Sequence, residues 1–201
     1  MASKTELANM AISHLGIGKE IANLDTEVSQ EAQACRRYFD TTIEAVLSDY
    51  DWPFASKEVV LNLIVANPTL EWDFSYRYPT DCIRLRRIKS GIRQDTSSSR
   101  VPFKIMYDPT GKILYTDKEN AEVEYTLRLT DPTVYTAEFS IAFSFRLAAY
   151  IAPRLTGGDP FKMKNEMLQQ YFLELGNAKS RSMNEERSDP PGDSEFITAR
   201  S

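Results

Sequence analysis

Apolar residues recur every three or four positions at the start of the chain, which is the spacing of one face of a helix. The first such run covers residues 4–15, with Ser3 before it and Gly16 after it. Ser3 and Glu6 have the spacing of a capping box, in which each side chain accepts a backbone N–H of the other residue. Glycine just beyond a helix supplies the left-handed conformation that commonly ends it. The pattern predicts a short helix over residues 4–15.

A second and more regular stripe predicts a longer helix that ends near Tyr50. Its apolar positions alternate spacings of three and four, and they are Val28, Ala32, Cys35, Phe39, Ile43, Val46 and Tyr50. Pro53 follows shortly afterwards. Proline has no amide hydrogen and restricts the residue before it, so the helix cannot continue through this point.

From residue 56 to residue 135 the chain is rich in β-branched and alternating residues, which predicts antiparallel strands. Asp108 to Gly111 read Asp-Pro-Thr-Gly, a turn sequence with proline second and glycine fourth, and this predicts a hairpin. A serine-rich segment at residues 91–100 predicts a mobile loop. The predicted strands lie at residues 59–64, 72–76, 82–88, 101–107, 112–116 and 121–129.

Helical spacing returns after residue 135. Phe139, Phe143 and Leu147 share one face, and Gly157 and Gly158 end that run. Asp159 then offers an N-cap carboxylate and Pro160 a first helical residue, so a fourth helix is predicted to reach about residue 184. This order predicts an α+β fold without parallel βαβ units.

The predicted architecture is a four-helix unit with an inserted antiparallel β-subdomain and an irregular C-terminal tail. Residues 1–55 and 136–187 form the helical part, residues 56–135 the insertion and residues 188–201 the tail. The tail is polar and proline-containing, and it carries an isolated apolar pair, Phe196 and Ile197. Such a segment is typical of a tether that orders on binding, and equally of a frayed terminus.

Charge and composition narrow the class of protein. Lys and Arg number 24 against 29 Asp and Glu, a net charge of -5, which argues against a clamp that neutralises DNA phosphates. No apolar run approaches the roughly 20 residues that span a bilayer, so no membrane role is predicted. The first residues lead into a helix without a signal-peptide pattern, which predicts synthesis in the cytoplasm. Cys35 and Cys82 stand apart from any motif and are predicted to be reduced core residues.

The sequence contains little that predicts catalysis. The one histidine, His14, lies on an apolar helix face, where a structural imidazole is the commoner role. We find no GxSxG elbow, no phosphate-binding glycine loop and no metal-ligand spacing. We therefore predict no catalytic residue, metal site or cofactor, while a spatial pair of carboxylates stays open because sequence does not reveal their separation.

A basic cluster comprises Arg84, Arg86, Arg87, Lys89 and Arg93. On a regular strand Arg84 and Arg86 share the face opposite Ile83 and Leu85, so the favoured interpretation is the solvent face of an amphipathic strand. A nucleic-acid patch is a second interpretation. A third is a subunit interface, in which these arginines pair with Glu122 and Glu124 of a neighbour.

Four segments taken together carry a family resemblance that spans nearly the whole chain. They are Leu15-Gly16, Ala34-Cys35-Arg36-Arg37, Asp51-Trp52-Pro53-Phe54-Ala55 and Tyr76-Arg77-Tyr78-Pro79-Thr80-Asp81-Cys82-Ile83-Arg84. In these the sequence resembles the tail tubular protein A family, the head-to-tail adaptor or gatekeeper proteins of short-tailed bacteriophages and related prophages.

The resemblance implies a non-enzymatic structural protein of the virion neck, made in the host cytoplasm, that joins the portal protein to the tail nozzle protein. It implies self-association as a dodecameric ring through which DNA passes without sequence-specific binding. The candidate portal-docking residues are Phe196, Ile197 and Arg200. The candidate residues of a subunit or tail interface are Arg84, Arg86, Arg87, Arg93, Asp108 and Gly111. The alternatives are a tail-associated peptidoglycan hydrolase and a DNA-binding accessory protein.

Overall fold

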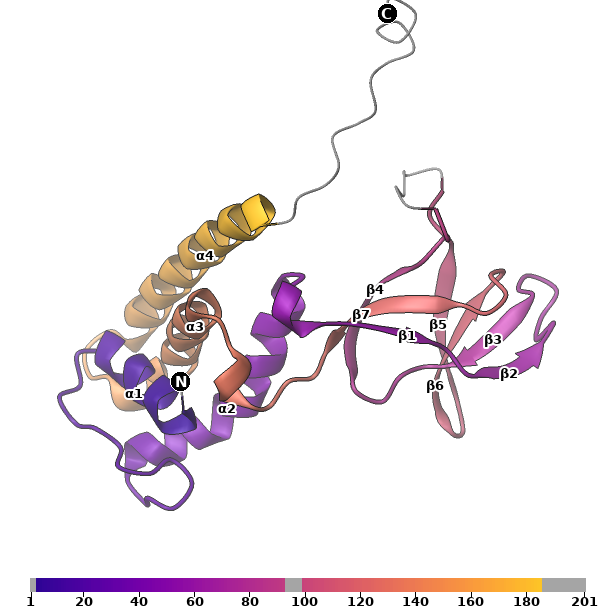
Figure 1. Ribbon diagram of the computed structural model, residues 1–201. Helices are drawn as coiled ribbons and strands as arrows, with labels where there is room; N and C mark the ends of the chain where they lie inside the picture. The colour runs from indigo at the N-terminus through magenta and orange to yellow at the C-terminus, as the bar shows by residue number, and fades with distance from the viewer. Residues whose placement is uncertain (1–2, 93–98, 186–201) are drawn as a thin grey trace, which may run out of the picture.

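The chain folds into two units that lie side by side, one helical and one built of strands (Figure 1). The structure is a computed structural model, and it describes residues 3–92 and 99–185. Within those residues there are four α-helices and two antiparallel sheets of three and four strands, so the predicted α+β class is confirmed. The proposed tail at residues 188–201 and positions 93–98 of the predicted loop at residues 91–100 lie outside the described residues.

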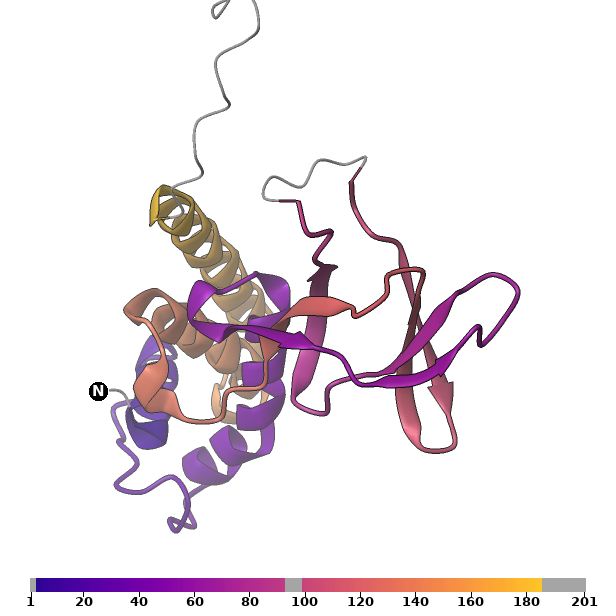
Figure 2. The same cartoon turned by 45° about the vertical axis from the view of Figure 1, so that its right-hand side comes forward.

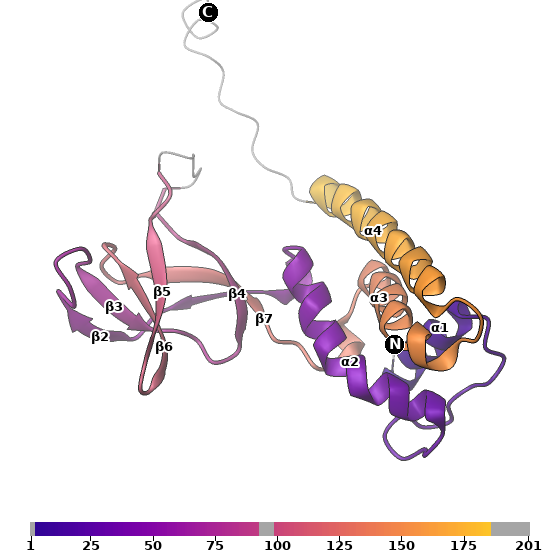
Figure 3. The same cartoon turned by 180° about the vertical axis from the view of Figure 1, so that it is seen from behind.

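The helical unit is organised around its third helix, which packs against each of the other three. Seen from behind, that helix lies between the first, second and fourth (Figure 3). The four helices are α1 (Lys4–His14), α2 (Gln30–Asp49), α3 (Ala137–Leu155) and α4 (Pro160–Glu185). None of the helices in the described part of the chain is long and apolar enough to cross a membrane.

The predicted helix ends agree with the structure where a local motif marks them. Ser3 Oγ accepts the Glu6 amide at 3.1 Å and a Glu6 carboxylate oxygen accepts the Ser3 amide at 2.8 Å, which completes the capping box. Gly16 follows α1 with a φ of 70°, the left-handed conformation that glycine adopts most easily. Asp159 Oδ1 accepts the Lys162 amide at 3.0 Å at the start of α4.

The predicted start of α2 was wrong at Val28. Its side chain is 80% exposed and precedes the helix. Ser29 is the N-cap, because its hydroxyl oxygen accepts the Ala32 amide at 3.3 Å. The stripe therefore begins at Ala32, and the preceding valine matched its spacing by coincidence.

The β unit contains two sheets, whereas the sequence predicted only one set of strands. The three-stranded sheet has the order β1-β7-β4, with β1 (Ser56–Val60), β7 (Glu122–Leu127) and β4 (Cys82–Ile88). The four-stranded sheet has the order β2-β3-β6-β5, with β2 (Leu63–Ala66), β3 (Phe74–Arg77), β6 (Gly111–Thr116) and β5 (Phe103–Asp108). Figure 2 shows how the β2–β3 and β5–β6 hairpins diverge from the three-stranded sheet.

The single strand predicted at residues 59–64 is two strands that belong to different sheets. The Leu61 amide donates to Ala121 O at 2.9 Å, beside the three-stranded sheet. One residue later, Asn62 O accepts the Arg77 amide at 3.0 Å, beside the four-stranded sheet. The backbone therefore changes its pairing partner between Leu61 and Asn62. As a result, the apolar run at residues 59–64 contributes to β1 in one sheet and to β2 in the other.

The hairpin between β5 and β6 agrees with its prediction. Asp108 lies opposite Gly111, and one Asp108 carboxylate oxygen accepts the Thr110 amide at 2.8 Å. Gly111 has a φ of 130°, a conformation that residues with a Cβ rarely adopt. The Asp-Pro-Thr-Gly sequence thus specifies this turn through its own side chain and its glycine.

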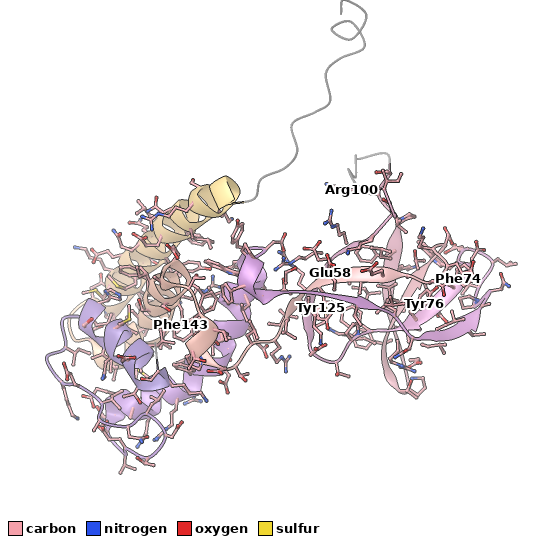
Figure 4. All side chains as sticks on the ribbon, viewed as in Figure 1. Glu58, Phe74, Tyr76, Arg100, Tyr125 and Phe143 are labelled. Atoms are coloured by element: carbon pink, nitrogen blue, oxygen red, sulfur yellow. The ribbon has the colours of Figure 1, made fainter. Side chains whose placement is uncertain are left out.

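Each unit has its own buried core. Figure 4 labels Phe143 in the helical unit, and Tyr76 and Tyr125 in the β unit. Phe139 is fully buried at the centre of the helical core and contacts four aromatic rings, those of Trp52, Phe54, Tyr135 and Phe143. The residues that follow α2 therefore pack under α3 and join the β unit to the helical core.

We expect Phe139→Ala to lower the free energy of unfolding by about 3 to 5 kcal/mol, because it leaves a cavity that four rings surround. Ile141→Ala, two residues along the same helix at a position 37% exposed, is the control and should cost less than about 1 kcal/mol. Urea denaturation measures both. Equal losses for the two variants would contradict the central role of Phe139.

Candidate functional site

The basic strand β4 does not alternate as a regular strand does. Cys82, Leu85 and Ile88 are buried, a repeat of three residues rather than two. The register against β7 shifts between Cys82 and Arg84 and again between Leu85 and Arg87. Each shift adds a residue and turns the following side chains. The predicted solvent face is therefore wrong for Arg86, whose side chain is only 8% exposed.

The Arg86 guanidinium is bonded on every side. Its Nη2 donates to Trp52 O at 2.7 Å and its Nε to Thr126 Oγ1 at 3.1 Å. Its Nη1 lies 3.4 Å from Glu124 Oε1, and its Nε lies 3.2 Å from Asp51 Oδ1. This one side chain therefore connects β4 to β7 and to the segment that leaves α2.

Glu124 is the acidic counterpart on β7. Its Oε2 accepts from Arg87 Nε at 2.7 Å, and its Oε1 accepts from Ser56 Oγ at 3.1 Å. Burial opposes ionisation of this carboxyl, but the hydrogen bond and charge of Arg87, with Ser56 and Arg86, outweigh it and hold its pKa below the ordinary value. The carboxylate is charged and fully engaged at neutral pH.

The neighbouring cations are paired inside the same chain. Arg84 Nη2 bonds Asp51 Oδ1, and Lys89 Nζ lies 2.5 Å from Glu58 Oε2 and 3.1 Å from Glu122 Oε1. We call Arg84, Arg86 and Arg87 the arginine cluster. The carboxylates predicted to reach these cations from a neighbouring copy, Glu122 and Glu124, belong to the adjacent strand of the same copy.

A hollow of about 510 Å³ lies beside the arginine cluster. Polar and apolar side chains share its wall, and they are Asp51, Arg86, Arg87, Ile88, Arg100, Val101, Phe103 and Glu124. In residues 3–92 and 99–185, no carboxylate lies within ion-pairing distance of the Arg100 guanidinium. The wall of the hollow therefore contains three arginines and two carboxylates, which is an excess of one positive charge.

A second hollow, of about 390 Å³, lies on the other side of β7 around Asp81. Lys57 Nζ lies 2.7 Å from Asp81 Oδ2, and the Tyr125 hydroxyl donates to Asp81 Oδ1 at 2.8 Å. Burial opposes ionisation of Asp81, but these two hydrogen bonds hold its pKa below the ordinary value. A glycosidase acid needs the opposite shift, a raised pKa, so this carboxyl suits a structural role better.

His14 has the contacts of a structural imidazole. Its Nε2 lies 2.9 Å from Ser144 Oγ, and its ring stacks on Phe145 with centroids 3.9 Å apart. The Ser144 hydroxyl donates to Ile141 O at 2.7 Å, so its proton is directed to the backbone and away from His14. Burial lowers the pKa of His14, which favours the neutral ring.

The other chemically reactive residues are also enclosed. Cys35 and Cys82 are both buried and free, as predicted, and burial raises the pKa of the Cys35 thiol to about 12. Among the residues that the structure describes, no group of three or more His, Cys, Asp or Glu is placed to hold a metal ion.

The predicted interface residues fall into two places. Arg84, Arg86 and Arg87 lie together on β4, whereas Asp108 and Gly111 form the β5–β6 turn and line neither hollow. The sequence did not indicate the hydrogen-bond and ion-pair partners of this site, which are Asp51, Trp52, Thr126 and Ser56. Asp51 and Trp52 belong to residues 51–55, one of the four segments that carry the family resemblance. Their place in that segment was the only sequence signal that could have indicated their role. Arg93, Phe196, Ile197 and Arg200 lie outside the described residues.

A comparison of the chain with models of known protein families finds no match, and a comparison with curated protein sequences finds none either. A proposal about function can therefore draw on the geometry above and on the resemblance of the sequence.

We expect Arg86→Leu to lower the free energy of unfolding by about 3 kcal/mol, because it leaves the Trp52 carbonyl and the buried Thr126 hydroxyl without this donor and removes one of the two arginines that pair with Glu124. Arg84→Leu on the same strand is the matched control. Its side chain is 44% exposed, so its loss should cost less than about 1 kcal/mol. Urea denaturation separates the two, and a larger loss for the Arg84 variant would contradict the burial argument.

We expect Glu124 to make the free energy of unfolding depend on pH in the acidic range. Its pKa is lowered in the folded state, so its contribution is complete above the ordinary value of 4.5 and is lost as the pH falls through the folded value. The stability difference between the native chain and Glu124→Gln should therefore shrink on acidification. Glu119→Gln, which removes an exposed carboxyl, is the control. Denaturation midpoints along a pH series provide the measurement, and a constant difference for Glu124→Gln would contradict the assignment.

Proposed function

We propose that this chain is a structural subunit of a bacteriophage head-to-tail connector, which joins the portal to the tail nozzle and acts by assembly. The resemblance of its sequence to the tail tubular protein A family supports this reading. So does the shape of the subunit, in which a helical unit and a β unit lie side by side and each can meet a different partner (Figure 1).

The observation that carries the proposal is that apolar side chains stay exposed on both units. On α4, Phe161, Phe172 and Leu173 are 68, 61 and 57% exposed. On the β unit the exposed apolar residues include Leu63, Ile64, Val65, Ile105, Met106 and Tyr107. Exposed apolar residues that follow one another along a strand, as Leu63 to Val65 and Ile105 to Tyr107 do, are of the kind that marks protein interaction sites. A subunit that has such surface at both ends is suited to contact partners on both sides.

The arginine cluster supports the same proposal by fixing the two units to each other. Arg84 and Arg86 reach Asp51 beyond the end of α2, and Arg128 Nη2 lies 3.1 Å from Glu44 Oε1 on α2. A connector has to keep a constant spacing between its two ends, and the enclosed Arg86, more than the exposed pairs of Arg84 and Arg128, resists bending where the units meet.

The same pairing gives less support to the alternative of a DNA-binding accessory protein. A phosphate-binding patch needs cations whose charge is free to replace counterions. Arg86 and Arg87 instead share Glu124, and Arg84 is paired with Asp51. In the proposed connector, DNA passes without sequence-specific contact, and the net charge of -5 favours its release.

In this proposal the partners are the portal protein, the nozzle protein and further copies of the chain in a dodecameric ring. Phe196, Ile197 and Arg200 are the portal-docking residues. Neither a catalytic step nor a cofactor forms part of the proposal.

We expect native mass spectrometry to show a complex between this protein and its cognate portal ring, and deletion of the residues after Pro190 to abolish it. The deletion should leave the melting temperature unchanged, because the two buried cores that the structure describes are built from residues between Leu7 and Ala178. A chain that keeps the tail but carries Phe196→Ala and Ile197→Ala tests the apolar pair alone. A complex that survives the deletion would contradict the docking role, and the absence of a complex at every salt concentration would contradict the connector.

A further inference from the structure

The four-stranded sheet ends in two open edges. Its order is β2-β3-β6-β5, so β2 and β5 each pair with one strand only. Within residues 3–92 and 99–185, no strand pairs with the outer side of either. The β2–β3 hairpin lies at the end of the β unit far from the helices, in both views of Figures 1 and 2. The β2 edge therefore lies at the distal end of the molecule, and among the described residues no strand pairs with its outer side.

The edge at β2 lacks the charges and prolines that commonly protect such a strand, and its protection is limited to a length of four residues and a register shift against β3 between Leu63 and Val65. Its sequence is Leu-Ile-Val-Ala, with no charge and no proline, and all four residues are exposed. Leu63, Ile64 and Val65 are 53, 42 and 49% exposed. Successive strand residues point to opposite faces, so this edge is apolar on both faces. An edge of this kind is a template for another strand.

The edge at β5 is also apolar and exposed, at its three residues from Ile105 to Tyr107. Ile105, Met106 and Tyr107 are 39, 40 and 73% exposed and are consecutive, so both faces of this strand are apolar too. Its charges, Lys104 and Asp108, meet no charge of like sign on β2, which has none. Strand pairing between these edges would bury apolar side chains on both faces without repulsion.

The direction of the strands decides which edges can join in a ring. All three pairings in the sheet are antiparallel, so β2 and β5 run in opposite directions. In a ring, each copy is related to the next by a rotation about the ring axis. If the sheet edges meet, β5 of one copy then lies beside β2 of the next, and the two strands run antiparallel. The antiparallel hydrogen bonding of the sheet can therefore continue from one copy into the next. A two-fold pairing of β2 with β2 would close a dimer and leave both β5 edges open.

We propose that β5 of one copy pairs with β2 of the next copy, so that the four-stranded sheets join into one continuous sheet around the assembly. This inference rests on the proposed function, because it identifies the surface through which copies of the connector subunit meet. The occupant of each apolar edge is therefore a second copy of this chain.

Cysteine cross-linking tests the pairing directly. Val65→Cys is combined in turn with Ile105→Cys, Met106→Cys and Tyr107→Cys, three positions that cover both faces of β5. The full chain is oxidised with diamide, which takes up the two hydrogens lost by each pair of thiols. The native Cys35 and Cys82 are buried, so they do not compete. Samples are oxidised alone and with the cognate portal ring, and are separated without reductant.

At least one double variant should give a ladder of dimers, trimers and larger multiples, because each copy then has one thiol at each edge. Val65→Cys alone should give no dimer. Strong dimers from that single variant would establish the two-fold pairing and overturn the proposal. Absence of a ladder from every double variant in samples that do bind the portal would also overturn it, while the connector function would stand.

A charge pair provides a second measurement that does not depend on thiol geometry. Ile64→Lys and Met106→Glu each place a charge on one exposed edge, so each alone should prevent self-association while leaving the melting temperature unchanged. The double variant should regain association, because lysine then faces glutamate across the proposed contact. A double variant that stays as dispersed as either single variant would contradict the β5-to-β2 pairing. Self-association without portal binding would instead contradict the connector function alone.

Discussion

The buried guanidinium of Arg86 lies where the helical unit passes into the β unit. Removing a cation from water is costly unless donors and counter-charges replace the lost hydration. Here the Trp52 carbonyl, the Thr126 hydroxyl and two carboxylates provide that replacement. Because those groups come from two separate stretches of chain, residues 51–52 and 124–126, the guanidinium on β4 is satisfied only when both stretches are in place. The junction between the units therefore has one favourable arrangement, and the position of the hollow lined by Asp51, Arg86 and Glu124 follows from it.

The features that sequence predicted correctly are those whose cause is local. The capping box of Ser3 and Glu6, the left-handed Gly16 and the Asp108-to-Gly111 turn each depend on residues within a few positions of one another. The α+β class followed from the same kind of evidence, because the change from helical to alternating spacing is visible in short windows. In the predicted stripe of α2, Val28 was wrong, because Ser29 is the N-cap and the helix begins at Gln30.

The errors arose where distant partners decide the structure. The bulges in β4 depend on its register against β7, and no pattern within residues 82–88 shows them. They turn Arg86 inward, so a side chain predicted to face solvent became the most enclosed cation of the arginine cluster. The change of sheet at Leu61 and Asn62 likewise depends on Ala121 and Arg77. Of the candidate site, the sequence indicated the basic residues but not their acceptors.

The insertion of the β unit between α2 and α3 has a consequence for how the chain folds during synthesis. The first two helices leave the ribosome well before the helix that completes their core. The contact between His14 and Ser144 spans 130 residues, and that between Asp49 and Tyr171 spans 122. Closing loops of this length costs entropy before any contact repays it, and folding slows as contacts become more distant in sequence. The β unit, whose strands are contiguous in sequence, is complete when residue 127 emerges, so it can fold first and hold the two halves of the helical core near each other.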